Sequence, residues 1–169
     1  MLEESAAYGD FVLSETGKGR GSLHGEAVTV ELPDGPLFVL LKLPDAKGSL
    51  GGRVTDALSG GVHSGDFDTY FQQVKALGGW FGHATAELPQ DYWPMMVRFR
   101  NLSNPASIEE IKSGSVVVKR ISLETTNEPV TRRISKRLPW LDRLAQYRTD
   151  PDNPFTNNLP SEIGSLRNP

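Results

Sequence analysis

The sequence predicts an α+β domain, with a mostly antiparallel sheet of about four or five strands and two main helices packed on one face. Period-2 alternation followed by a tight turn predicts a hairpin at 28–43, and apolar residues at helical spacing predict helices at 66–77 and 129–138. These elements do not alternate as βαβ units do, and the 17 glycines and 12 prolines indicate many irregular connections.

The hairpin is the clearest of these elements. From 27 to 32, apolar and polar side chains alternate, as in a half-buried strand. The Pro-Asp-Gly-Pro sequence at 33–36 predicts a turn, because proline fixes φ and glycine permits a positive φ. The segment 37–43 is apolar on both faces except at Lys42, so we expect it to be the partner strand and the most buried one.

Two later segments, 94–100 and 116–125, also alternate and are expected to be strands. Between them, Ser107 and Glu110 have the spacing of a capping box, which predicts a short helix over SIEEI. A further short helix is expected near 54–58, within a glycine-rich connection.

The two main helices have recognisable ends. Asp66 or Asp68 can cap the first, and Gly78 and Gly79 follow its last residue. In the second, Asn127 is a suitable N-cap and Pro129 suits the first turn. Its apolar stripe toward the sheet consists of Val130, Ile134 and Leu138.

The chain is expected to contain one domain, since 169 residues can form a single core. We expect a flexible segment at 1–22 with a short strand near 11–13, the α+β domain at 23–147, and a tail rich in proline and asparagine at 148–169. No apolar run approaches the roughly 18 to 20 residues of a membrane span, so no transmembrane segment is predicted.

Charge is distributed unevenly along the chain. The net charge of −3 argues against nucleic-acid binding, which needs a basic contact face. Residues 112–148 nevertheless carry 9 basic and 3 acidic side chains. Because there is no cysteine, disulfides, thiolate metal sites and a cysteine nucleophile are excluded.

The basic residues of the second helix are the favoured binding surface. The predicted binding residues are Arg132, Arg133, Lys136, Arg137 and Trp140, with Arg143 following them. Arginine is suited to acidic protein surfaces, and a tryptophan is often an interface anchor. The alternative is a solvated helix face with Trp140 packed in the core.

Signals for catalysis are weaker. His63, Asp66, Asp68 and His83 include residue types that bind metals, but no histidine pair has helical ligand spacing. Ser64 lies beside His63, and adjacent side chains of an extended chain point apart, so a triad is not indicated. The sequence therefore predicts no metal, no cofactor and no catalytic residue.

Three stretches, HGEAVTVELPDGPLFVLL (24–41), LPQDYWPMMVRFRNLSNPASIEEI (88–111) and VKRISLETTNEPVTRRISKRLPWL (118–141), resemble a family of uncharacterised proteobacterial proteins. They lie between residues 24 and 141, a span of about two thirds of the chain, and the EPVT and KRLPWL elements are the most specific. Family members have an N-terminal hydrophobic segment, which implies association with the cell envelope. The resemblance implies no activity and no catalytic residues.

The sequence favours a non-enzymatic protein-binding domain that meets an acidic protein surface, and an inhibitor or immunity-type partner of a bacterial toxin is its most concrete form. One alternative is a small hydrolase or metal-dependent enzyme. Another is a module that binds a small ligand or lipid at an aromatic group formed by Trp80, Phe81, Tyr92 and Trp93. The location stays open: periplasmic or membrane-anchored if a preceding segment is removed, and otherwise cytoplasmic. The oligomeric state is also open.

Overall fold

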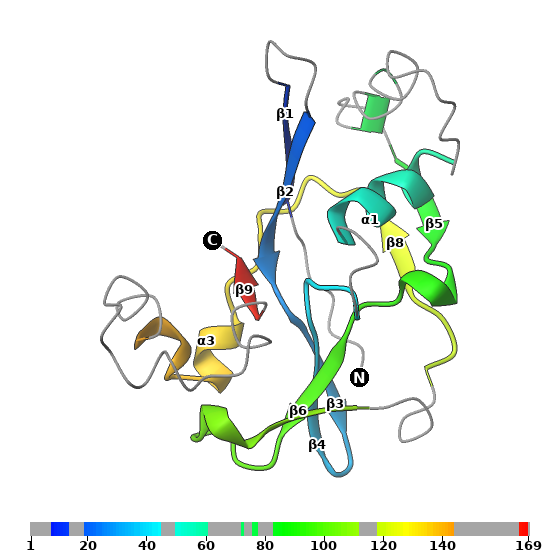
Figure 1. Ribbon diagram of the computed structural model, residues 1–169. Helices are drawn as coiled ribbons and strands as arrows, with labels where there is room; N and C mark the ends of the chain where they lie inside the picture. Colours follow the sequence, from blue (N-terminus) through cyan, green and yellow to red (C-terminus); the bar gives the residue numbers. More distant parts are fainter. Residues whose placement is uncertain are drawn as a thin grey trace.

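The computed structural model describes residues 8–13, 19–44, 50–60, 72, 76–77, 83–111, 118–143 and 166–168. The α+β class is confirmed: the described residues form a four-stranded antiparallel sheet, two smaller sheets and a few short helices (Figure 1). Side chains are described from residue 24 onward within these ranges, up to Arg167.

The main sheet has the strand order β3-β4-β6-β7, and all its neighbours are antiparallel. Its strands are β3 (Val28–Leu32), β4 (Gly35–Val39), β6 (Met96–Phe99) and β7 (Ile108–Glu110). The predicted hairpin and the predicted strand at 94–100 are confirmed. Gly35 follows the Pro33-Asp34 turn with φ +117°, and an added Cβ there would meet nothing within 4 Å, so backbone conformation is what favours glycine.

The helix predicted over SIEEI is wrong. A 3-10 turn, η2 (Pro105–Ser107), comes first, and Ile108–Glu110 is the strand β7. The Ser107 hydroxyl donates to the carbonyl oxygens of Asn101 and Asn104 at 2.9 and 2.7 Å, which holds the turn instead of starting a helix. The backbone beyond it pairs with β6, so sheet pairing prevails over the local capping signal.

Two smaller sheets flank the main one. The first has the order β1-β2-β9 and contains β1 (Tyr8–Leu13), β2 (Gly19–Glu26) and β9 (Arg167–Asn168). The second pairs β5 (Thr85–Glu87) with β8 (Ser122–Glu124), so the strand predicted at 116–125 is shorter than expected. Both terminal segments of the chain thus contribute strands.

The helices are short. Besides η2, the described part of the chain includes α1 (Leu50–Leu58), α3 (Ile134–Arg137), the 3-10 turn η1 (Gln90–Tyr92) and helical residues at 141–143. The second predicted helix starts five residues later than expected and ends at Arg137. Leu138 caps it with a ψ of 76°, which is not helical because Pro139 follows. The predicted helix at 66–77 lies outside the described residues, except for Gln72, Ala76 and Leu77.

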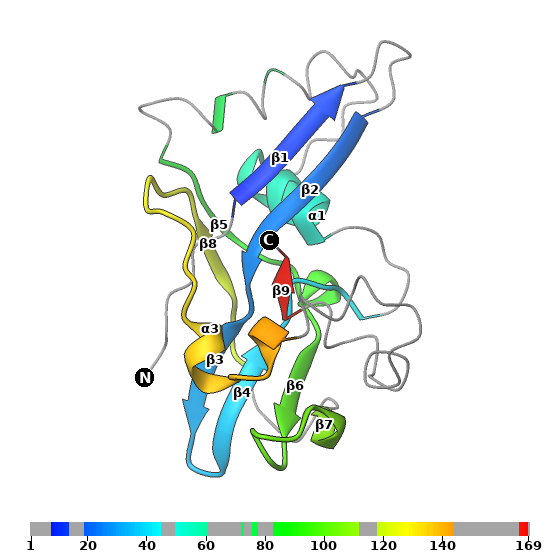
Figure 2. The same cartoon turned by 90° about the vertical axis from the view of Figure 1, so that its left-hand side faces the viewer.

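The buried side chains form two clusters. The larger one joins the main sheet to α3 and to the residue before β9, and its members are Ala27, Phe38, Leu40, Val97, Phe99, Ile134, Leu138, Trp140, Leu141 and Leu166. The smaller one, centred on Leu43, Leu50 and Leu88, lies under α1. Figures 1 and 2 agree that α3 and β9 lie on one side of the β2–β3 ribbon, and that α1, β5 and β8 lie on the other.

Candidate docking surface

The segment that carries the predicted binding residues is held at its start by a carboxylate from β2. Glu26, the last residue of β2, is 4% exposed. One of its oxygens accepts the backbone N–H of Arg133 at 2.6 Å, and the other accepts that of Ile134 at 2.8 Å. These bonds satisfy donors that the start of a helix leaves open, and a charged acceptor makes them strong. Glu26 therefore fixes the backbone where α3 begins.

The C-terminal strand holds the same segment at two further points. Arg167 on β9 is the cross-strand neighbour of Glu26. Its Nη1 atom lies 2.7 Å from Oδ1 of Asp142 and 3.4 Å from Oγ of Ser135. The Ser135 hydroxyl donates to the same Asp142 oxygen at 2.9 Å. A residue near the end of the chain thus ties the two ends of the 135–142 stretch together.

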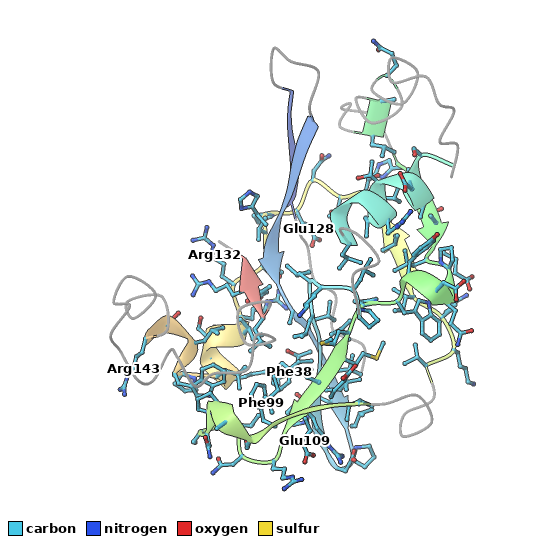
Figure 3. All side chains as sticks on the ribbon, in the orientation of Figure 1. Phe38, Phe99, Glu109, Glu128, Arg132 and Arg143 are labelled. Atoms are coloured by element: carbon cyan, nitrogen blue, oxygen red, sulfur yellow. The ribbon has the colours of Figure 1, made fainter. Side chains whose placement is uncertain are left out.

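Three of the five predicted binding residues, Arg132, Arg133 and Lys136, have exposed side chains, and so does Arg143. Figure 3 places Arg132 and Arg143 on the side of the molecule where α3 and β9 lie. We call the side chains of Arg132, Arg133, Lys136 and Arg143 the basic surface. Arg143 was not among the five main predicted residues, although the same charge pattern indicated it.

Trp140 lies in the larger core cluster. It is 8% exposed, its indole N–H donates to the carbonyl oxygen of Leu102 at 2.7 Å, and its ring meets that of Phe99 edge-on at 5.5 Å. A buried indole with its donor satisfied stabilises the fold. The structure thus places Trp140 apart from the exposed cations.

Arg137 differs from its basic neighbours because it forms an ion pair with Glu31 on β3. Among the described side chains, the arginines that form ion pairs are Arg53, Arg98, Arg100, Arg137 and Arg167. None of the ion pairs found in those described ranges involves the basic surface. Its four side chains are therefore exposed and have no ion-pair partner among the carboxylates that the structure describes.

Another charged group lies on the main sheet. Arg98 contacts Asp34 at 3.1 Å and Glu109 at 3.5 Å, and Arg100 also pairs with Glu109. The hydrogen bond from Arg100 and the charges of both guanidinium groups lower the pKa of Glu109 below its ordinary 4.5, against an opposing effect of desolvation. Because these charges are mutually paired, this group offers little net charge to a partner.

Most of the residues considered for metal binding or catalysis lie outside the described ranges, among them His63, Asp66 and Asp68. His83 is exposed. Within the described ranges, no group of three or more histidine, aspartate or glutamate side chains is arranged to hold a metal ion. The same described segments contain no helix long and apolar enough to cross a membrane.

Half of the predicted aromatic group can be placed. Tyr92 and Trp93 pack against the smaller core cluster, and the indole N–H of Trp93 donates to the carbonyl oxygen of Leu88 at 2.9 Å. The guanidinium of Arg53 lies 4.4 Å from the centre of the Tyr92 ring. These contacts give both rings a structural role. Trp80 and Phe81 lie outside the described residues.

Comparisons of the chain with protein-family models, with curated proteins and with solved structures find no match. The class that the fold and the surface define is an α+β domain with four exposed arginine and lysine side chains between 132 and 143, none of which forms an ion pair with another described residue.

Proposed function

We propose that this chain is a non-enzymatic protein-binding domain that docks an acidic protein through the basic surface. The observation that supports this proposal is the contrast between two sets of arginines. Those on the sheet and α1 are neutralised by carboxylates, whereas Arg132, Arg133 and Arg143 cluster within twelve positions without ion pairs in the described structure.

An acidic protein surface suits this arrangement chemically. A guanidinium presents a rigid fork of donors that matches a carboxylate in two parallel hydrogen bonds. Charges arranged in this way favour long-range attraction and orient the partner before contact. Three arginines and one lysine on a backbone held at Glu26 therefore favour a partner with a complementary row of aspartates or glutamates.

A membrane surface is the less favoured partner. The apolar side chains of the same segment, Ile134, Leu138 and Trp140, are buried and cannot insert into lipid. Four cations contribute about 1 kcal/mol each near an anionic bilayer, or about 4 kcal/mol in total, which corresponds to a dissociation constant of about 1 mM. A protein partner that forms paired hydrogen bonds with these side chains provides a larger binding free energy.

An inhibitor or immunity-type partner of a bacterial toxin is the most concrete version of this function. In that version the toxin would present its acidic face to the basic surface. Co-purification of a toxin expressed with the wild-type chain, and its loss with Arg132→Glu/Arg133→Glu, would support it.

The general proposal can be tested with a defined probe, a fluorescein-labelled peptide of glutamates, whose binding is followed by fluorescence anisotropy. We expect wild-type protein to bind it, and binding to weaken as salt shortens the screening length from about 10 Å at 0.1 M to about 3 Å at 1 M. The double variant Arg132→Glu/Arg133→Glu should lose more than about tenfold in affinity, because it places like charges against the peptide.

The matched control is Lys119→Glu/Arg120→Glu. Both residues are exposed and precede β8, outside the basic surface, and the two double variants change the net charge equally. We expect this control to stay close to the wild type. Equal losses in both variants, or no binding by the wild type, would contradict the proposal. Tighter binding to vesicles with anionic lipid than to the peptide would favour the membrane instead.

A further inference from the structure

The four residues of the basic surface lie at or next to positions that are tethered to other parts of the fold. The backbone of Arg133 is bound to Glu26, and Arg132 precedes it directly. Lys136 follows Ser135, and Arg143 follows Asp142, which is bonded to both Ser135 and Arg167. Each cation of the basic surface is therefore itself a tethered residue or is adjacent to one in the sequence.

The tethers originate from one cross-strand pair. Glu26 on β2 lies opposite Arg167 on β9, and the preceding residue, Leu166, is fully buried in the larger core cluster. The backbone N–H of Ala27 donates to the carbonyl oxygen of Leu166 at 2.8 Å. The core therefore fixes β9 beside β2, and β9 in turn carries Arg167 to the basic segment.

We infer that Glu26 and Arg167 are the positioning residues of the basic surface, so that partner binding depends on the docking of the C-terminal strand. This inference rests on the proposed function and adds to it a condition on the chain itself. Glu26 is too buried to touch a partner, and it acts through the backbone of Arg133 and Ile134. Residues 166–168 are therefore required for partner binding, although they do not belong to the basic surface.

The direction in which peptide affinity changes distinguishes a positioning role from an effect of net charge alone. Glu26→Gln and Asp142→Ala each remove one negative charge near the basic surface. If only net charge mattered, both variants would bind the glutamate peptide more tightly than the wild type. If positioning matters, both should bind about three- to tenfold more weakly, since weakening or losing a charge-assisted hydrogen bond frees the segment it held.

Glu128→Gln is the charge-matched control. Glu128 is an exposed carboxylate upstream of the same segment, labelled in Figure 3, and its side chain takes part in no ion pair found among the described residues. The Glu128→Gln variant should bind the peptide as tightly as the wild type or slightly more tightly. Because Asp142 is exposed, Asp142→Ala is expected to stay folded, which keeps the comparison decisive if Glu26→Gln unfolds.

A measurement without ligand distinguishes failure of this inference from failure of the proposed function. Hydrogen exchange of the Arg133 and Ile134 amides should be slow in the wild type and faster by about tenfold or more in Glu26→Gln. Fast exchange with weaker peptide binding would support positioning. Unchanged exchange with tighter binding would overturn it. If the wild type does not bind the peptide, the proposed function fails, while the exchange rates still decide whether Glu26 holds the segment.

Discussion

Glu26, at the end of β2, accepts the backbone N–H of Ile134 at 2.8 Å across 108 positions of sequence. This bond joins the end of β2 to α3, a helix that packs on the main sheet through the larger core cluster. A single buried carboxylate thus connects the fold of the first third of the chain with the charged surface of the last.

Replacement of Glu26 by alanine is expected to destabilise the protein. The change leaves the backbone N–H groups of Arg133 and Ile134 without their acceptor, which costs about 1.5 to 3 kcal/mol of unfolding free energy. Urea denaturation followed by circular dichroism measures this. Glu128→Ala, at an exposed position, should stay within about 0.5 kcal/mol of the wild type. Similar unfolding free energies for both variants would mean that the Glu26 hydrogen bonds do not stabilise the fold.

Trp140→Phe tests the structural role of the indole. Phenylalanine keeps an aromatic ring beside Phe99 but loses the N–H that donates to Leu102, so we expect a loss of about 1 to 2 kcal/mol in unfolding free energy. Trp93→Phe removes a comparable bond to Leu88 at a half-buried site and should cost less. If Trp140→Phe left stability unchanged and weakened peptide binding, Trp140 would be an interface residue instead.

Leu166→Ala should show that the C-terminal strand belongs to the core. Its side chain is fully buried, and removal of a buried leucine costs about 2 to 5 kcal/mol. Leu32→Ala, at the half-buried end of β3, provides the control and should cost less. Thermal and urea unfolding of both variants decide the point. A smaller effect at Leu166 than at Leu32 would contradict the described packing.

Arg133 and Arg137 should contribute unequally to binding of the glutamate peptide. Arg137 is already paired with Glu31, whereas the side chain of Arg133 is exposed. Arg133→Ala should weaken binding about two- to fivefold, and Arg137→Ala less than about twofold. Anisotropy titrations in the same buffer compare them. A larger loss with Arg137→Ala would show that its ion pair opens when the peptide binds.

Glu109 should make stability depend on acid pH. Its pKa is lowered in the folded state by Arg100 and Arg98, so its carboxylate stabilises the fold above the unfolded-state pKa. That contribution is lost as the pH falls through the folded-state pKa, below 4.5. Glu109→Gln should therefore have a lower melting temperature than the wild type at pH 7, and the difference should shrink as the pH falls below 4.5. A constant difference over this range would rule out the linkage.

The sequence by itself determined the α+β class, the hairpin of β3 and β4, and the cluster of basic residues after 130. These depend on local properties: alternation that selects a strand, a proline and a glycine that select a turn, and charge that is read directly from composition. Such features need no knowledge of which segments meet in space.

Tertiary structure alone decided which of those basic and aromatic residues face solvent. Trp140 turns inward to Phe99, Arg137 meets Glu31, and Leu166 enters the core from a tail that looked separate. It also replaced the helix expected at 107–111 with a strand against β6. The physical reason is that burial and pairing depend on partners far away in the sequence. A glutamate in a glycine-rich run, such as Glu26, has no local pattern that marks it as the acceptor for a helix 108 positions later.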